Sequence, residues 1–318
     1  MWLPILVAVL VLIFWYRWHR QSQILENLSD KYVLITGCDS GFGNLLAKQL
    51  DRRGLLVLAA CLTEKGAEDL KKETSRRLQT VILDVTDSQS VSSAVKWVTS
   101  VVGDKGLWGL VNNAGVSLPT APNEWLTKED FFKILNVNLL GVIDVSLKML
   151  PLIKKAKGRL VNVASVAGRL TFCGGGYCMS KYGVESFSDR LRVEMIPFGV
   201  KVSIVEPGFF KTQVTDANLQ KEQLRKIWAR LPEETRKSYG QQYLDKYCST
   251  LETVLSMSSA KLSLVTDCME HALTAVYPWS RYSAGLDAKI LYLPLSYFPT
   301  AIADFVMNLT YPKPSQSV

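Results

Sequence analysis

Four polar side chains in the middle of the chain are of types that together support proton transfer from an alcohol: Asn138, Ser165, Tyr177 and Lys181. Tyr177 and Lys181 are four residues apart, which places them on one face of a predicted helix. A free phenol has a pKa of about 10 and is a poor base at neutral pH. A lysine ammonium one turn away favours the phenolate and lowers that pKa. The spacing therefore predicts that Tyr177 accepts an alcohol proton.

Ser165 and Asn138 complete this set. Ser165 closes a predicted strand before Tyr177, and its hydroxyl is expected to bond the reacting oxygen. Asn138 is expected to hold a water that relays protons from Lys181. A Tyr-x-x-x-Lys pair by itself is usually a surface pair, so the prediction depends on all four residues occurring in order.

A glycine-rich turn, Thr36-Gly-Cys-Asp-Ser-Gly-Phe-Gly43, lies between the first predicted strand and the first predicted helix. Gly37 permits a tight turn, Gly41 lets the backbone approach a pyrophosphate, and Gly43 allows close helix–strand packing. The helix N-terminus offers free N–H groups to phosphates. A plain strand-to-helix turn is the alternative, but the position after the first strand favours a dinucleotide site. A nicotinamide there would accept the hydride while Tyr177 takes the proton.

Two other predicted strand ends carry candidate cofactor residues. Asp84 ends the third strand and is expected to accept from an adenine amino group; capping of the following helix is the alternative. The run Asn112-Asn-Ala-Gly115 ends the fourth strand. Its asparagines are expected to tie neighbouring strands, while Ala114 and Gly115 leave room for a cofactor.

Short apolar runs alternate with helical patterns through most of the chain. The predicted strands cover 31–36, 55–60, 80–84, 107–112, 159–164 and 201–206, and the predicted helices cover 42–53, 88–102, 129–154 and 177–198. This alternation predicts an α/β fold, a single Rossmann-type domain with a doubly wound parallel sheet, over 30–286. The pattern breaks into polar helical pieces over 209–261, which we interpret as a substrate-side insertion.

Composition excludes several other classes. The 318 residues include only two histidines, which lie far apart in the sequence, so a multi-histidine zinc site and a Ser-His-Asp triad are disfavoured and no metal is expected. The net charge is +8 without a basic run or stripe, which argues against nucleic-acid binding. The six cysteines form no CxxC pair and are interpreted as free thiols.

Both ends of the chain are apolar. Residues 2–16 carry no charge and are followed by Arg17 and Arg20, which predicts an uncleaved membrane anchor over 1–20. A cleaved signal peptide and a soluble packing helix are the alternatives. The positive-inside rule places the main domain in the cytosol, whereas sequons at Asn27 and Asn308 would matter only on the lumenal side. The segment 287–318, interrupted by prolines, is expected to lie on the membrane or to cap the core.

Together these motifs resemble the short-chain dehydrogenase/reductase superfamily over residues 31 to about 286. Longer strings resemble its microsomal retinol dehydrogenase and hydroxysteroid dehydrogenase branch; they occupy 38–47, 59–67, 104–109, 174–178 and 267–271. Ala164 and Leu286 stand where many relatives have Ser and Trp, and the second difference bears on the pocket or the membrane face. The resemblance adds Pro207, Gly208 and Thr212, whose loop closes over the nicotinamide in that superfamily. The full set of expected cofactor-binding residues is Gly37, Ser40, Gly41, Phe42, Gly43, Thr63, Asp84, Asn112, Ala114, Gly115, Tyr177, Lys181, Pro207, Gly208 and Thr212.

The resemblance implies a membrane-bound, NAD-dependent dehydrogenase of retinol or hydroxysteroids in the endoplasmic reticulum (microsomal) membrane. Phe172, Phe209, Phe210 and Trp228 are candidates for an apolar substrate pocket beside Ser165, with core packing as the alternative for each. A dehydrogenase of long-chain hydroxy-lipids and a non-catalytic nucleotide-binding regulatory protein are the alternative functions. The sequence does not decide between a monomer and a homo-oligomer.

The cofactor is expected to be NAD because no arginine follows the second predicted strand to attract a 2′-phosphate. The residues there are Ala60-Cys-Leu-Thr63, which also lack the usual carboxylate. Thr63 is expected to bond a ribose hydroxyl, and Glu64 would disfavour a phosphate. Lys65 argues in the opposite direction.

Overall fold

A computed structural model describes residues 2–309 and 311–316 of the chain. Seven parallel strands form one sheet in the order β3-β2-β1-β4-β5-β6-β7. The strands are β1 (Tyr32–Thr36), β2 (Leu56–Cys61), β3 (Gln79–Ile82), β4 (Gly109–Asn112), β5 (Arg159–Val163), β6 (Lys201–Pro207) and β7 (Arg281–Ala284). The predicted Rossmann-type fold is therefore confirmed. The sequence pattern missed β7, which is short and only half buried.

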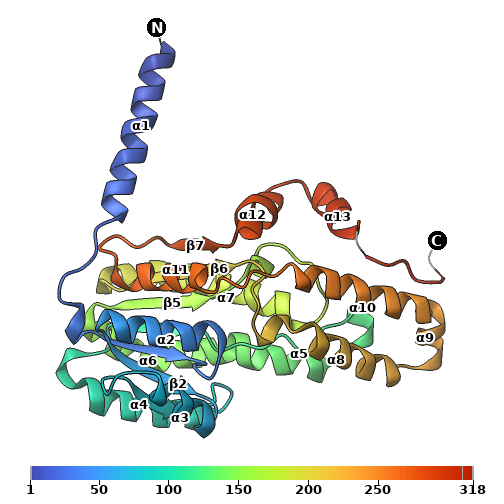
Figure 1. Ribbon diagram of the computed structural model, residues 1–318, viewed down its shortest axis with the longest axis horizontal. Helices are drawn as coiled ribbons and strands as arrows, with labels where there is room; N and C mark the ends of the chain where they lie inside the picture. Colours follow the sequence, from blue (N-terminus) through green and yellow to red (C-terminus); the bar gives the residue numbers. More distant parts are fainter. Residues whose placement is uncertain (1, 310, 317–318) are drawn as a thin grey trace.

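Helices cover both faces of the sheet (Figure 1). One face is packed by α2 (Gly41–Arg53), α3 (Glu64–Lys72) and α11 (Ser263–Thr274). The other is packed by α4 (Ser88–Val102), α6 (Val142–Ala156) and α7 (Gly176–Met195). Parallel strands need this double cover because both of their faces are apolar.

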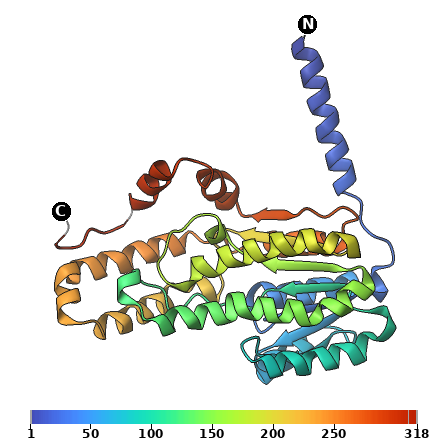
Figure 2. The ribbon, with the colours of Figure 1, turned by 180° about the vertical axis from the view of Figure 1, so that it is seen from behind.

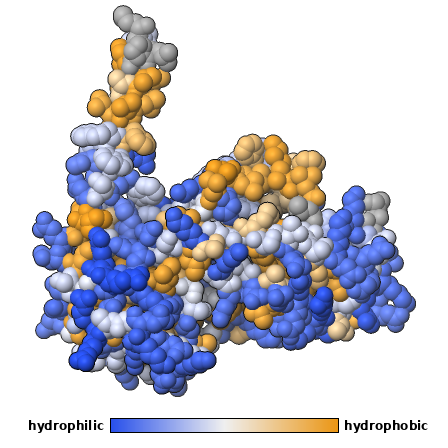
Figure 3. All heavy atoms as spheres, in the orientation of Figure 1, coloured by the Kyte–Doolittle hydropathy of each residue, from blue (hydrophilic) through white to orange (hydrophobic). Residues whose placement is uncertain are grey.

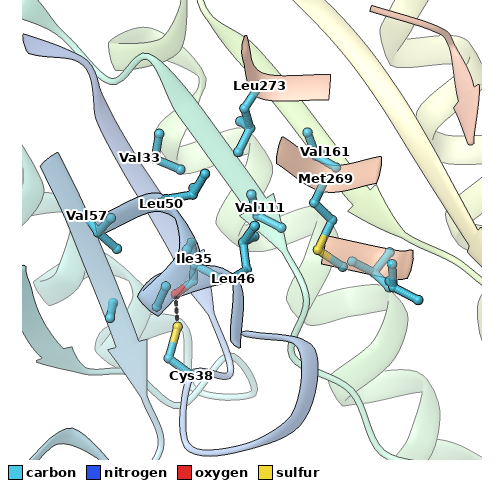
Figure 4. Packing of buried hydrophobic residues seen from close by; sticks show 14 of the residues in the cluster. Val33, Ile35, Cys38, Leu46, Leu50, Val57, Val111, Val161, Met269 and Leu273 are labelled. Carbon is cyan, nitrogen blue, oxygen red and sulfur yellow. Dashed lines mark hydrogen bonds between the residues drawn. The ribbon is translucent and has the colours of Figure 1, made fainter. Parts of the chain in front are cut away.

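Buried aliphatic side chains fill the first face. Leu46 and Leu50 of α2 lie against Val33 of β1. Met269 and Leu273 of α11 lie beside them on the same face of the sheet (Figure 4). All five side chains are fully buried. This packing fixes the N-terminus of α2 next to the end of β1.

The predicted helix over 129–154 is wrong as a single α-helix. It consists of α5 (Lys128–Leu135), a π-helical turn η4 (Asn136–Gly141) and α6. π turns inside helices often occur at functional sites, and this one holds Asn138. By length and composition the stretch Lys128–Ala156 is apolar enough to cross a membrane, and no other described helix passes that test. It packs on β4, β5 and α4, so we assign it to the domain core.

The segment over 209–261 is helical, as expected. It contains α8 (Ala217–Ala229), α9 (Glu233–Tyr239) and α10 (Gln241–Ser256). These helices share a small apolar cluster with Trp125, whose ring lies 5.0 Å from the ring of Trp228. Trp228 therefore packs inside the helical insertion.

The two ends of the chain project on the same side of the domain (Figures 1 and 2). Helix α1 (Trp2–Gln21) stands away from the sheet, and the C-terminal segment forms η8 (Ala288–Tyr292), α12 (Leu293–Leu295) and α13 (Thr300–Asn308). The C-terminal segment packs inward through Leu295 and Ala303. Its outward side chains include several exposed large apolar residues: Ile290, Leu291, Tyr297, Phe298, Ile302, Phe305 and Leu309.

Candidate active site

The glycine-rich turn after β1 is shaped by close backbone approaches. Gly37 and Gly41 have φ of +70° and +62°, a conformation that favours glycine. A Cβ on Gly43 would overlap the carbonyl oxygen of Gly37 and the side-chain amide of Asn113. Helix α2 can therefore begin directly against the turn only because position 43 lacks a side chain.

The N-terminus of α2 is suited to an anion. Ser40 is the N-cap residue, yet its side chain makes no capping hydrogen bond, which leaves the first N–H groups of α2 without that partner. Phosphate oxygens bind such N–H groups. The ring of Phe42 packs edge-on against Phe210, with ring centroids 5.7 Å apart, and so fixes the turn to the core. The residues present thus fit the pyrophosphate of a dinucleotide.

The loop after β4 is tied to the same turn. The backbone N–H groups of Asn113 and Ala114 both donate to Thr36 Oγ1 at 3.0 Å. Asn112 donates to Asn162 Oδ1 of β5 at 2.8 Å. The asparagines therefore join neighbouring strands, as the sequence indicated, at the point where the strand order reverses. Ligands bind at such points in open parallel sheets.

A carboxylate that was not predicted from the sequence lies next to the end of β2. Asp39, from the glycine-rich turn, accepts from the N–H of Leu62 at 2.8 Å and from the N–H and hydroxyl of Thr63 at 3.0 and 2.7 Å. Thr63 also caps α3 by accepting from Gly66. The Thr63 hydroxyl donates to Asp39, which presents the acceptor charge here, and a ribose contact for Thr63 stays a prediction. The pairing of β1 with β2 brings these loops together.

Asp84 lies two residues beyond the end of β3. Its Oδ1 accepts from the N–H and hydroxyl of Thr86 at 2.8 and 2.7 Å, so it forms a local turn. The N-cap of α4 is Asp87, which bonds Gln89 N. The alternative interpretation of Asp84 as the helix cap is therefore wrong, and an adenine contact for it stays a prediction.

Ser165 and Tyr177 meet at the carboxyl edge of the sheet. Ser165 follows β5, where its Oγ donates to the carbonyl of Pro207 at 3.3 Å and accepts from Ala167 N at 3.1 Å. Tyr177 lies in the first turn of α7. Lys181, one turn further on, places its Nζ 5.7 Å from the centre of the Tyr177 ring and donates to the carbonyl of Val163 at 2.9 Å.

Burial dominates the acidities of this pair. It raises the pKa of the Tyr177 phenol above its ordinary value, while a hydrogen bond with Ser165 lowers that pKa by a smaller amount. Burial also lowers the pKa of the Lys181 ammonium to about 8, against the charge of Glu185. The protein alone therefore does not supply the lowered phenol pKa that the sequence spacing predicted. Additional positive charge is needed at this edge for Tyr177 to act as a base.

The Asn138 side chain holds the loop after β4 in place. Its Oδ1 accepts from Val116 N at 2.8 Å, and its Nδ2 donates to Val116 O at 2.8 Å and to Ser180 Oγ at 3.1 Å. The amide hydrogens are therefore used to hold the loop after β4 against α7. The Asn138 side chain therefore positions this loop, and the expected water relay from Lys181 stays a prediction.

Gly115 lies close to the side chains of Asn138 and Lys181. A Cβ on it would come within 3.4 Å of Asn138 Oδ1 and 3.8 Å of Lys181 Nζ. The loop after β4 thus passes close to the catalytic candidates, and its small residues keep the space open.

The loop after β6 closes the site from the other side. Gly208 N donates to Ala284 O of β7 at 2.9 Å, and Phe209 N donates to Asp287 at 2.7 Å. Thr212 lies beside the glycine-rich turn, since a Cβ on Gly41 would be 3.7 Å from its methyl group. Pro207, Gly208 and Thr212 are thus brought to the edge that holds the turn.

Two of the predicted pocket aromatics are brought together. The rings of Phe172, Phe209 and Tyr292 form a mutual cluster with centroids 5.2 to 5.6 Å apart. Tyr292 comes from the C-terminal segment and was not predicted. Phe210 is buried in the core against Phe42, so its assignment to the substrate pocket is wrong. Adjacent residues of this loop face opposite ways, which a sequence does not reveal.

Comparison with known proteins gives a consistent result. The family model described as "short chain dehydrogenase" matches residues 31–223. The chain is 59% identical to 17-beta-hydroxysteroid dehydrogenase type 6 of Rattus norvegicus, covering 98% of this chain and 99% of that protein. It is 57% identical to retinol dehydrogenase 7 of Rattus norvegicus over all of both chains. The crystal structure of a short-chain dehydrogenase from Streptomyces avermitilis is similar in fold, with a TM-score of 0.68 and 24% identity over 89% of this chain and 94% of that one.

Proposed function

Because the chain belongs to the short-chain dehydrogenase family, we propose that its site oxidises a lipophilic secondary or primary alcohol, a hydroxysteroid or retinol, to the ketone or aldehyde. The enzyme is an oxidoreductase that uses NAD(P). The observation that carries the proposal is the convergence of Ser165, Tyr177 and Lys181 beside the glycine-rich turn.

Each of the three side chains has a separate task. Ser165 donates a hydrogen bond to the substrate oxygen, and Tyr177 removes the hydroxyl proton. Lys181 holds the cofactor ribose and adds positive charge next to the phenol. A bound oxidised nicotinamide supplies the hydride acceptor and a further positive charge. That charge offsets the effect of burial on Tyr177.

The substrate class is proposed from two independent features. Two relatives that cover the whole chain or nearly all of it are named for retinol and for a hydroxysteroid. In this chain the cluster of Phe172, Phe209 and Tyr292 provides an apolar, aromatic wall beside the catalytic edge. Apolar walls with few polar groups are typical of pockets for such ligands.

Turnover with a substrate panel tests this proposal. The membrane-bound full-length protein is assayed by absorbance at 340 nm with all-trans-, 9-cis- and 11-cis-retinol, with 3α- and 17β-hydroxysteroids, and with long-chain hydroxy-lipids. We expect turnover with retinol or a hydroxysteroid. Turnover with hydroxy-lipids alone would contradict the substrate class, and cofactor binding without any turnover would indicate the regulatory alternative.

We propose NAD rather than NADP as the cofactor. The carboxylate of Asp39 stands at the end of β2, where the adenosine ribose lies in dinucleotide-binding sheets. A carboxylate repels a 2′-phosphate and accepts from ribose hydroxyls. The hydrogen bonds from Leu62 and Thr63 hold this charge in place.

Replacing Asp39 with Asn is expected to reduce the preference for NAD. The variant keeps an acceptor near Thr63 but removes the negative charge, so the ratio of kcat/KM for NAD to that for NADP should fall by about tenfold, or about 1.4 kcal/mol. Steady-state kinetics at fixed alcohol concentration measures this ratio. Lys65→Ala is the control, because Lys65 follows Thr63 and Glu64 at the start of α3 and is the cation that argues for NADP in the sequence. A wild-type preference for NADP that Lys65→Ala abolishes would contradict the assignment to Asp39.

The membrane assignment rests on the apolar surface. In α1 nearly every described side chain from Ile5 to Trp18 is exposed, and the apolar side chains of α12 and α13 lie on the same side of the domain (Figure 3). Exposed apolar surface of this extent indicates contact with a partner or a bilayer. We propose that residues 1–20 anchor the enzyme in the endoplasmic reticulum membrane, that 287–318 rest on that membrane, and that the domain faces the cytosol.

Removal of residues 1–20 is expected to release much of the protein from microsomal membranes. The remaining contact is the C-terminal segment alone, and α1 contributes the longer apolar helix. Carbonate extraction followed by blotting of pellet and supernatant measures the release. Retention at the full-length level would place the anchor at 290–309 instead, and complete protease protection in sealed microsomes would contradict the cytosolic orientation.

A further inference from the structure

Two thiols flank the candidate base in the chain. Cys173 lies in the loop before α7, and Cys178 directly follows Tyr177 in the first turn of that helix. Their sulfur atoms are 3.4 Å apart and are not bonded to each other. A disulfide bond is about 2.05 Å long, so a small movement of the loop would join them.

The environment of Cys178 favours the thiolate. The hydrogen bond between the two sulfur atoms, in which either thiol can be the donor, lowers the pKa of Cys178 to about 7, in opposition to burial. The N-terminus of the twenty-residue helix α7 acts in the same direction. The same contact raises the pKa of Cys173. The pair therefore has one nucleophilic sulfur and one proton-bearing partner.

A cavity borders the pair, in which Cys178 is buried and Cys173 is half-buried. It has a volume of about 440 Å³ and is lined by both thiols together with Asn123, Thr171, Gly175, Met179 and Tyr182. Met179 and Tyr182 are exposed on the surface of α7.

We propose that Cys173 and Cys178 form a covalent modification site that low-molecular-weight disulfides oxidise to an internal disulfide, and that this modification slows turnover. The Cys178 thiolate attacks one sulfur of the external disulfide, which forms a mixed disulfide and releases one thiolate. The Cys173 thiol then loses its proton to solvent and attacks the Cys178 sulfur, which releases the second thiolate. The protein loses two electrons and two protons, and the external disulfide is reduced to two thiols.

Two effects of the internal bond on Tyr177 oppose each other. Loss of the thiolate charge favours the phenolate, but the thiols rank below both burial and Ser165 among the influences on the pKa of Tyr177. Closing the sulfur–sulfur distance shifts the first turn of α7, and misplacement of a catalytic group by about 1 Å can cost 10²-fold in rate. The geometric effect is therefore expected to dominate.

Oxidised glutathione is the test reagent for the full-length enzyme. We expect peptide mapping of the wild type to show a Cys173–Cys178 cross-link, with a loss of two hydrogens, and turnover to fall by about tenfold or more and to return with a reducing agent. Cys173→Ser is expected to accumulate the mixed disulfide on Cys178 without a cross-link. Cys268→Ser is the matched control, since Cys268 bonds only Leu264 O among the described contacts and the variant should respond as the wild type does.

The mass readout does not depend on the proposed function, whereas the rate readout rests on it. Absence of the cross-link under conditions that modify other cysteines would overturn the site. A cross-link that leaves turnover unchanged would overturn its effect on catalysis. A response that Cys268→Ser abolishes would assign the effect to a different thiol.

Discussion

Replacing Tyr177 with Phe is expected to lower kcat by about 10²-fold or more while leaving cofactor binding nearly intact, because only the proton acceptor is lost. The ring still fills its buried site next to Ser165 and Cys178. The hydride can leave the alcohol only as its hydroxyl proton departs, so the remaining rate depends on water or on Lys181. Steady-state turnover and cofactor binding by protein fluorescence measure the two effects separately.

Tyr182→Phe provides the matched control. Tyr182 lies on the same helix but is 43% exposed. Its variant should keep wild-type turnover. If Tyr177→Phe keeps more than a tenth of the wild-type kcat, Tyr177 is not the base.

Replacing Lys181 with Met is expected to damage both cofactor affinity and turnover. Methionine fills a similar volume, but the substitution removes the ammonium that donates to Val163 O and lies 5.7 Å from the centre of the Tyr177 ring. The phenol then lacks its nearest positive charge, and the ribose loses a donor. Measurement of cofactor Kd and kcat in the same preparation separates the two roles. A loss in only one of them would show that the double role is wrong; Lys226→Met, on the exposed face of α8, should change neither.

The stability difference between Lys181→Met and the wild type is expected to depend on pH. Burial lowers the folded pKa of Lys181 to about 8, below its ordinary 10.5. Between these values the unfolded chain binds the proton more tightly, so this lysine's contribution to stability improves as pH rises through that window. Below pH 8 the unfavourable burial of the charge is fully present. In thermal unfolding, the Tm of Lys181→Met relative to that of the wild type should therefore be higher at pH 7 than at pH 10.

The local motifs were predictable because their chemistry depends on neighbours in sequence. Tyr177 and Lys181 share a helix face at any helix orientation, and the turn from Gly37 to Gly43 needs glycines wherever it packs. Asp39 could not be placed without the register of β1 on β2, which brings its carboxylate to Leu62. Its position directly inside the glycine-rich turn was the available signal.

The roles of other residues could not be predicted, because they depend on the direction in which the folded backbone points each side chain. Phe209 and Phe210 are adjacent, yet one joins the aromatic cluster and the other the core. Asn138 was expected on a regular helix, and the π turn redirects its side chain to Val116. The strand β7 has too few residues and too mixed a pattern to be recognised from its composition.

Under the proposed membrane assignment, the common side of α1 and the C-terminal segment changes how the enzyme meets its substrate. A lipophilic alcohol partitions into the bilayer, so its relevant concentration is a mole fraction in the lipid and not a molarity in water. Addition of inert phospholipid at constant total alcohol should then lower the rate by surface dilution, although nothing in the aqueous phase has changed. Tyr292 belongs to the segment that lies on this side and also to the aromatic wall of the site, so under that assignment the wall reaches towards the bilayer.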